Sequence, residues 1–229
     1  MRIHWIQHVP YEGLGTIGEW ASERGHFVTG SLALTESYPD PITIDWLVVM
    51  GGAMGVHDEP RHPWLVAEKR FIYNAIDSGA RVLGVCLGAQ LAADVLGAQV
   101  SPNAEREVGW FPVELTPEGR SSRVFGVLPE RFLAGQWHAD TFEVPPGGVR
   151  MASSEACVNQ AFEWEERVYG LQFHLEWDAA AVSRLADECG GDLSAGRYIQ
   201  AREQLLGQPR RFDESRELMF RLLDAMDVG

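Results

Sequence analysis

Short apolar segments alternate with amphipathic segments through the first half of the sequence. Residues 44–50 and 81–85 are almost continuously apolar, which is typical of strands that are buried on both faces of a sheet. Between them, one face of a helix is indicated by Trp64, Ala67, Phe71 and Ala75, and Gly79 follows where that helix would end. Strands that alternate with helices in this way predict an α/β fold, with a mostly parallel central sheet flanked by helices.

The second half of the sequence has shorter strand-like segments separated by Pro and Gly turns. They lie at 108–115, 132–142, 151–153, 158–164 and 168–173, and we expect them to add short antiparallel strands to the sheet. Residues 190–229 predict a helical extension whose apolar stripe, which includes Leu218, Leu222 and Met226, would pack on the sheet or form a dimer contact. We interpret residues 1–229 as one domain.

The acidic composition argues against several classes of function. The chain has 19 Lys and Arg against 33 Asp and Glu, a net charge of −14, and a surface of this sign repels nucleic acid. No apolar run is long enough for a membrane helix and the N-terminus lacks a signal-peptide core, so we expect a cytoplasmic protein that does not bind membranes. Three cysteines, none in a Cys-x-x-Cys pair, argue against a disulfide framework or a zinc site.

One of those cysteines stands in a Gly-x-Cys-x-Gly pattern. Gly84–Gly88 joins the end of a predicted buried strand to the start of a predicted helix, as in a nucleophile elbow with sulfur in place of oxygen. Cys86 would then lie at a helix N-terminus, where the dipole and free N–H groups favour a thiolate. The N–H of Leu87 would point toward a developing oxyanion. The alternative is a buried structural cysteine that happens to lie between glycines.

A cysteine nucleophile needs a base, and the base needs an orienting group. The sequence QFHLE at residues 172–176 closes the last strand-like run. Side chains alternate along an extended chain, so His174 and Glu176 leave the same face, and a modest bend would bring the carboxylate to one imidazole nitrogen. The other nitrogen would remain for Cys86. The alternative for His174 and Glu176 is a solvated surface pair.

In combination, these motifs resemble the class I, or triad, glutamine amidotransferase family. The resemblance is carried by GVCLGAQ at residues 84–90 and QFHLE at 172–176, and it continues through EVGW at 107–110 and QWHAD at 136–140. It covers most of residues 45–177 and points to the free-standing, GMP-synthase-like branch. The family implies a flavodoxin-like form of the α/β fold.

The resemblance implies a catalytic triad of Cys86, His174 and Glu176. It also implies an oxyanion hole made by the backbone N–H groups of Gly52 and Leu87. Each role is assigned because the residue stands at the matching position of a family motif, and the motifs follow one another in the same order as in the family. The reaction that they imply is hydrolysis of the glutamine side-chain amide through a cysteine thioester, with release of ammonia and glutamate. No metal and no organic cofactor are expected.

The resemblance further implies which residues bind the small-molecule substrate. Gln90 matches a side chain that helps to hold glutamine. The backbone around Trp137 and His138 matches the segment that receives the amino-acid head group, with Asp140 beside it. The alternative for His138 and Asp140 is a solvated or structural pair, since the two side chains alternate on one face of a predicted strand.

Three residues depart from the usual family pattern. Leu175 stands where proline is usual, so the geometry between the predicted base and its orienting group is less restricted by the sequence. Ala53 also replaces a common proline and would loosen the predicted oxyanion loop. Trp137 replaces a frequent serine, which changes the expected substrate pocket.

The sequence leaves the ammonia acceptor open. It contains no Gly-rich phosphate loop with which to activate an acceptor by ATP. Either a separate synthetase subunit receives the ammonia, or the protein is a free-standing γ-glutamyl peptidase or hydrolase. Two further alternatives lie outside this family: an α/β-hydrolase in which Asp140 orients the histidine, and a non-catalytic binding module on the same fold.

Overall fold

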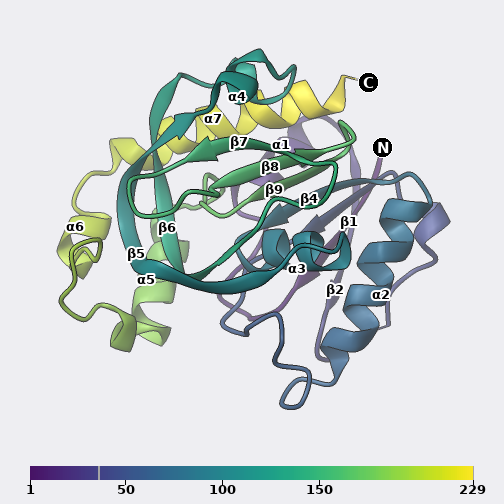
Figure 1. Cartoon of the computed structure of the whole chain (residues 1–229), viewed down its shortest axis with the longest axis horizontal. Helices are drawn as coiled ribbons and strands as arrows, with labels where there is room; N and C mark the ends of the chain where they lie inside the picture. Colours follow the sequence, from purple (N-terminus) through teal and green to yellow (C-terminus); the bar gives the residue numbers. More distant parts are fainter. Residues whose placement is uncertain (36, 229) are drawn as a thin grey trace.

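The computed structural model describes residues 1–35 and 37–228, so Glu36 and Gly229 of the predicted domain lie outside the described residues. In the described chain, nine strands form one sheet in the order β2-β1-β3-β4-β9-β8-β7-β5-β6 (Figure 1). The strands are β1 (Arg2–Gln7), β2 (Phe27–Leu32), β3 (Trp46–Val49), β4 (Arg81–Val85), β5 (Val100–Leu115), β6 (Arg131–Phe142), β7 (Val149–Ser153), β8 (Ala161–Trp164) and β9 (Val168–Leu171).

The sheet has a parallel part and an antiparallel part that meet at β9. Strands β2, β1, β3, β4 and β9 pair in parallel. Strands β8, β7, β5 and β6 continue the sheet in antiparallel fashion. This confirms the predicted α/β fold and the added antiparallel strands.

Two of the antiparallel strands are longer than the sequence predicted. Strand β5 has 16 residues and β6 has 12, and they form a curved ribbon along the end of the sheet (Figure 1). Strand β5 begins at Val100, eight residues before the predicted start at Val108. Residues 101–107 are mostly polar and exposed, and the register with β6 shifts between Pro102 and Glu107, so the apolar alternation that marks a strand is missing there.

Helices cover both faces of the sheet. The α-helices are α1 (Thr16–Glu23), α2 (Trp64–Asp77), α3 (Leu87–Val95), α4 (Pro117–Ser121), α5 (Ala179–Glu188), α6 (Arg202–Leu206) and α7 (Arg210–Asp227). Short 3₁₀ turns lie at η1 (Pro41–Thr43), η2 (Phe125–Val127) and η3 (Gly190–Asp192). Residues of α1 and α7 share one apolar core with the sheet, and residues of α2 and α3 share another. No described helix combines the length and apolarity that a membrane span requires.

Strand β3 explains why the central strands are continuously apolar. Trp46 and Val48 belong to the core under α1 and α7, whereas Leu47 and Val49 belong to the core under α2 and α3. Because successive side chains point to opposite faces, a strand with a core on each side has no position for a solvated residue.

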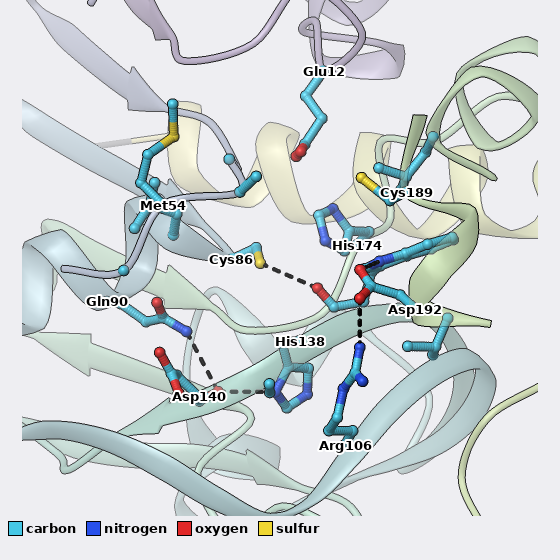
Figure 2. A pocket seen from close by; sticks show the side chains of 18 residues that line it. Glu12, Met54, Cys86, Gln90, Arg106, His138, Asp140, His174, Cys189 and Asp192 are labelled. Carbon is cyan, nitrogen blue, oxygen red and sulfur yellow. Dashed lines mark hydrogen bonds and ion pairs between the residues drawn. The ribbon is translucent and has the colours of Figure 1, made fainter. Parts of the chain in front are cut away.

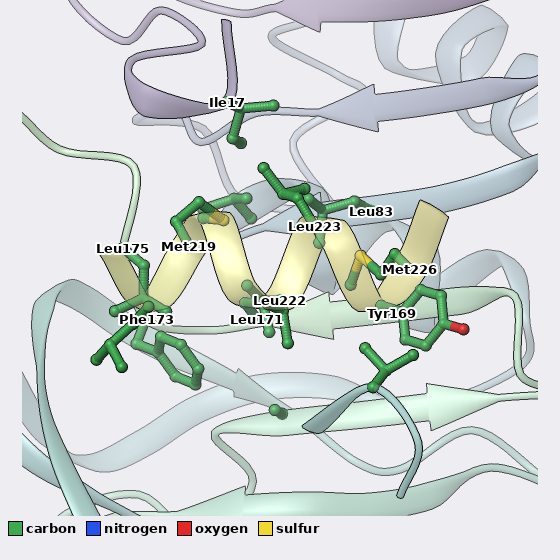
Figure 3. Packing of buried hydrophobic residues seen from close by; sticks show 14 of the residues in the cluster. Ile17, Leu83, Tyr169, Leu171, Phe173, Leu175, Met219, Leu222, Leu223 and Met226 are labelled. Carbon is green, nitrogen blue, oxygen red and sulfur yellow. The ribbon is translucent and has the colours of Figure 1, made fainter. Parts of the chain in front are cut away.

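The C-terminal helix completes the first of these cores. Met219, Leu222 and Leu223 of α7 all belong to this core, with Leu222 beside Leu171 of β9 and Leu223 toward Leu83 of β4 (Figure 3). All three α7 side chains are fully buried within the chain itself. Of the two expectations for this stripe, packing on the sheet is therefore confirmed.

The fold brings four loops to one edge of the sheet. Because β1, β3, β4 and β9 run in parallel, their carboxyl ends lie together, and ligands of open α/β sheets bind at such an edge. The segment from α5 to α6 folds over this edge, where Trp177, Val182 and Leu185 pack with Trp110 in a third apolar cluster. This arrangement leaves a covered pocket at the carboxyl ends of the parallel strands.

Candidate active site

Cys86 lies at a sharp turn between β4 and α3. Its φ of 52° is in the left-handed region, which is uncommon for a residue with a side chain. The flanking glycines allow the turn: a Cβ on Gly88 would collide with the carbonyl of Val49, and a Cβ on Gly84 with the backbone of Gly88. Helix α3 therefore begins directly against the sheet, with Cys86 as its N-cap residue. This is the geometry that the Gly-x-Cys-x-Gly pattern predicts.

His174 and Glu176 form a buried pair just after β9. The distance from His174 Nδ1 to Glu176 Oε1 is 2.6 Å, and the two side chains are 2% and 4% exposed. Backbone hydrogen bonds in both directions join His174 to Gly135 on β6. The indole of Trp177 stacks on the imidazole with the ring centroids 4.2 Å apart. The ring of His174 is thus held on one face by Trp177 and at Nδ1 by Glu176.

Burial and charge act in opposite directions on His174. Burial disfavours the imidazolium, but the negative charge of Glu176 and hydrogen-bonding interactions with Cys86 and Glu176 outweigh it. The pKa of His174 is therefore raised well above its ordinary value of 6.5. A protonated His174 can donate from Nδ1 to Glu176 and present its other nitrogen to Cys86, the arrangement of a thiolate–imidazolium pair.

A pocket of about 260 Å³ opens in front of Cys86 (Figure 2). It brings together most of the site residues that the sequence predicted, which are Gly52, Cys86, Leu87, Gln90, Trp137, His138, Asp140 and His174. Glu176 lies behind His174 and does not line this pocket. Asp140 has no hydrogen bond with His174 in the described residues, so the order expected for an α/β-hydrolase has no support from this geometry.

Gly52 reaches the pocket from the loop after β3, and Leu87 from the start of α3. A Cβ on Gly52 would lie 3.0 Å from Leu87 Cδ2, so the two residues are neighbours. Neither backbone N–H has a backbone acceptor among the described residues. Two unpaired N–H groups beside a cysteine can donate to an anionic oxygen.

A second histidine–glutamate pair lies behind the loop that contains Gly52. His8 follows β1, with Nδ1 3.0 Å from the Gly51 carbonyl oxygen and Nε2 2.7 Å from Glu68 Oε1 on α2. Burial opposes protonation of His8, but the charge of Glu68 and the hydrogen bonds raise its pKa above the ordinary value. His8 can therefore donate to both acceptors and fix the loop, and the sequence analysis did not identify this pair.

Gln90 lies on α3 and is connected to Cys86 through a neighbouring glutamine. Its Nε2 donates to Gln172 Oε1 at 3.0 Å, and Gln172 Nε2 lies 3.7 Å from Cys86 Sγ. The thiol of Cys86 in turn lies 3.7 Å from the carbonyl oxygen of Trp137. The backbone of Trp137 and the amide of Gln90 therefore both border the space in front of the sulfur.

The side chain of His138 belongs to a buried polar group with Glu107 and Cys157. The donor and acceptor atoms of the three residues lie within 4.8 Å of one another, and residues of these types also bind metals. Here all three have hydrogen-bond partners within the protein. Glu107 accepts from Ser154 Oγ and Gln160 Nε2. His138 Nδ1 bonds the Asp140 carbonyl oxygen, and Cys157 Sγ lies 3.2 Å from Thr141 Oγ1. We interpret the group as a structural network, which leaves only the backbone of His138 for a ligand.

Among the further residues that line the pocket, four have charged or thiol side chains that no sequence motif marked as part of a site. They are Glu12, Arg106, Cys189 and Asp192. Asp192 accepts hydrogen bonds from Arg106 at 2.7 Å and from the indole of Trp137 at 2.9 Å, and so closes one side of the pocket. Cys189 follows the apolar stripe of α5 at helical spacing, so the sequence predicts a core residue at this position. None of the four belongs to a recognisable motif.

Comparison with known proteins shows which family the chain resembles along its length. The family "Glutamine amidotransferase class-I" matches residues 31–182. The glutamine amidotransferase-like protein YfeJ of Salmonella typhimurium is 28% identical over 100% of this chain and 98% of its own length. The glutamine-hydrolysing GMP synthase of Aliivibrio fischeri is 36% identical over 58% of this chain, and the match spans 24% of that enzyme.

Solved structures share the whole fold. A crystal structure of a glutamine amidotransferase from Thermotoga maritima aligns with 100% of this chain and 99% of its own, with a TM-score of 0.89 and 29% identity. A structure of a glutamine amidotransferase from Methylobacillus flagellatus aligns with 98% of this chain and 93% of its own, with a TM-score of 0.91 and 24% identity, and shows the same fold.

Proposed function

The chain belongs to the class I glutamine amidotransferase family, and on that basis we propose that it hydrolyses the side-chain amide of glutamine with Cys86 as the nucleophile. One observation carries the proposal. The cysteine of the elbow and His174, 88 residues apart in the sequence, line one pocket at the carboxyl edge of the sheet, and Glu176 is paired with His174 from behind. A structural cysteine would need neither a histidine partner nor a pocket.

In the first half of the proposed reaction, the thiolate of Cys86 attacks the amide carbon and a C–S bond forms. The carbonyl oxygen becomes an oxyanion that accepts hydrogen bonds from the N–H groups of Gly52 and Leu87, each worth on the order of 3 kcal/mol. The His174 imidazolium gives its proton to the amide nitrogen as the C–N bond breaks. Ammonia leaves, and a γ-glutamyl thioester remains on the enzyme.

In the second half, water attacks the thioester carbon. His174, now neutral, takes a proton from the water, and the C–S bond breaks to release glutamate. The products are the Cys86 thiolate and the His174 imidazolium, so the starting pair is restored. Glu176 keeps the imidazole in the required orientation and stabilises its charged form.

We propose that the substrate head group lies against the backbone of Trp137 and His138. Gln90 and Asp140 border the same space, and the pocket extends from them to Cys86. Arg106 lines the same pocket, paired with Asp192, and we propose that its guanidinium favours the α-carboxylate of a bound amino acid. No step of this reaction requires a metal or an organic cofactor.

We also propose where the released ammonia goes. The match to the A. fischeri GMP synthase spans 24% of that enzyme, and by similarity to it we propose a separate synthetase subunit as the partner that uses the ammonia. The alternatives are a free-standing γ-glutamyl peptidase or hydrolase and a non-catalytic binding module.

The deciding experiment measures ammonia and glutamate release from L-glutamine, beside dipeptide release from γ-glutamyl peptides, with Cys86→Ala as the blank. Glutamine hydrolysis that is lost in Cys86→Ala would support the proposal and justify a search for a synthetase partner. Peptide cleavage with little glutaminase activity would assign a γ-glutamyl hydrolase instead. No turnover, together with no covalent adduct from an electrophilic glutamine analogue, would favour a binding module.

A further inference from the structure

Glu12 is an acidic residue in the pocket to which the proposed reaction gives no role. It lies in the loop between β1 and α1, and its side chain reaches toward the space between Cys86 and His174 (Figure 2). Its carboxylate forms no hydrogen bond and no ion pair in the part of the chain that the structure describes. Glu176 and Asp192 differ in this respect, because Glu176 is paired with His174 and Asp192 with Arg106.

The carboxylate of Glu12 faces one particular edge of the His174 ring. A Cβ on Gly51 would collide with Glu12 Oε2 and would lie 3.5 Å from His174 Cε1, so carboxylate and ring border the same small space. The Cε1 edge lies between Nδ1, which is bound to Glu176, and Nε2. Burial raises the pKa of Glu12 above its ordinary value, and the imidazoles of His174 and His8 oppose that rise.

The orientation of a bound amide follows from the proposed function, on which this inference rests. If the carbonyl oxygen lies at the N–H groups of Gly52 and Leu87, the amide nitrogen must lie on the side of His174 that protonates it. That side is the one that Glu12 faces. The leaving nitrogen of a primary amide carries two N–H groups, and among the described residues on this side of the pocket Glu12 offers a carboxylate that has no hydrogen bond or ion pair.

We propose that Glu12 is a specificity-determining residue that accepts a hydrogen bond from the leaving nitrogen and so selects a primary carboxamide, glutamine itself, over γ-glutamyl esters. An ester has the same γ-glutamyl part, but its leaving oxygen carries lone pairs and no hydrogen. Its approach to a carboxylate is repulsive, and the Glu12 charge is left without a partner. Discrimination of this kind depends on a polar group that the wrong substrate cannot satisfy.

The test compares kcat/KM for L-glutamine and for the γ-methyl ester of L-glutamate in the wild type, Glu12→Gln and Glu12→Ala. The two substrates give the same thioester, so kcat/KM isolates the steps in which they differ. Glu188→Gln is the matched control, because it removes the same charge from an exposed position at the end of α5. Far-ultraviolet circular dichroism and the alkylation rate of Cys86 show that the variants are folded and the nucleophile is intact.

The expected result is a fall of about 10-fold to 100-fold in kcat/KM for glutamine, the size of a lost hydrogen bond to a charged group, with kcat/KM for the ester unchanged or raised because the repulsion is removed. The amide-to-ester ratio therefore falls in both Glu12 variants and stays constant in Glu188→Gln. Equal losses on both substrates would overturn the inference and leave the proposed function standing. A wild type that hydrolyses neither substrate would overturn the proposed function and this inference with it.

Discussion

His174 Nδ1 and Glu176 Oε1 lie 2.6 Å apart, although the residue between them is Leu175 and not the proline that is usual at this position. Tertiary contacts hold the chain here in the conformation that brings the two side chains together. Leu175 is fully buried in the core under α7, Gly135 pairs with His174, and the Glu176 carbonyl accepts a hydrogen bond from the backbone N–H of Thr16 at 2.9 Å. The departure at Leu175 therefore leaves the His–Glu pair in place.

This pair makes Glu176 the expected orienting acid. We predict that Glu176→Gln lowers kcat for glutamine hydrolysis by about 100-fold to 10,000-fold, since the amide cannot stabilise the imidazolium. Asp140→Asn should mainly raise KM, because Asp140 borders the pocket without contacting His174. Steady-state kinetics on the two variants separates the triad from the α/β-hydrolase arrangement. If Asp140→Asn lowers kcat more than Glu176→Gln does, Asp140 is the orienting acid.

The raised pKa of His174 gives a second prediction, with a definite sign. In the wild type the imidazole should remain protonated well above pH 6.5, because Glu176 stabilises the charge. In Glu176→Gln the negative charge beside His174 is removed, whereas the burial that disfavours the imidazolium remains. The pKa of His174 should therefore fall. Titration of the His174 ring protons by NMR measures both values. An unchanged midpoint in Glu176→Gln would mean that Glu176 does not set the protonation of the base.

The parts of the site that the sequence predicted are those with a local pattern. Cys86 is marked by its two glycines and by the change from strand to helix at that point. His174 and Glu176 are marked by their position at the end of a strand-like run. Each of these signals lies within about five residues, so the chain does not have to be folded to detect it.

The parts that the sequence did not predict depend on contacts between distant segments. His8 and Glu68 are 60 residues apart, and each by itself is an ordinary polar residue in a loop or on a helix. Glu12 and Asp192 enter the pocket from opposite ends of the chain, in loops without periodicity. The start of β5 was missed for a related reason, since an exposed ribbon needs no apolar alternation.

The nucleophile gives a third prediction. Cys86→Ser should keep the fold and the affinity for glutamine while kcat falls by about 1,000-fold or more, because a hydroxyl is far less nucleophilic than a thiolate near neutral pH. Stopped assays of glutamate release and calorimetric titration with glutamine measure the two quantities. A serine variant with a large share of the wild-type kcat would contradict a thioester mechanism.

The packing of α7 gives a prediction about stability. Leu222 is fully buried between α7 and β9, so Leu222→Ala should lower the free energy of unfolding by about 2–5 kcal/mol. Val66→Ala is the control, because Val66 is 61% exposed on α2. Urea denaturation followed by circular dichroism measures both variants. If Leu222→Ala and Val66→Ala lower the free energy of unfolding by the same small amount, α7 is not part of the cooperative core.

Gly135 gives the last prediction, because it connects the packing of the sheet to the catalytic base. A Cβ at this position would collide with the six-membered ring of Trp177, which stacks on His174. Gly135→Ala should therefore displace the indole, loosen His174, and lower kcat by roughly 10-fold or more, together with a loss of about 1–3 kcal/mol of stability from overpacking. Gly191→Ala is the matched control, since a Cβ there meets nothing within 4 Å. Kinetics and thermal unfolding of the two variants test the idea, and a Gly135→Ala enzyme with wild-type kcat would show that Trp177 is not needed to hold the imidazole.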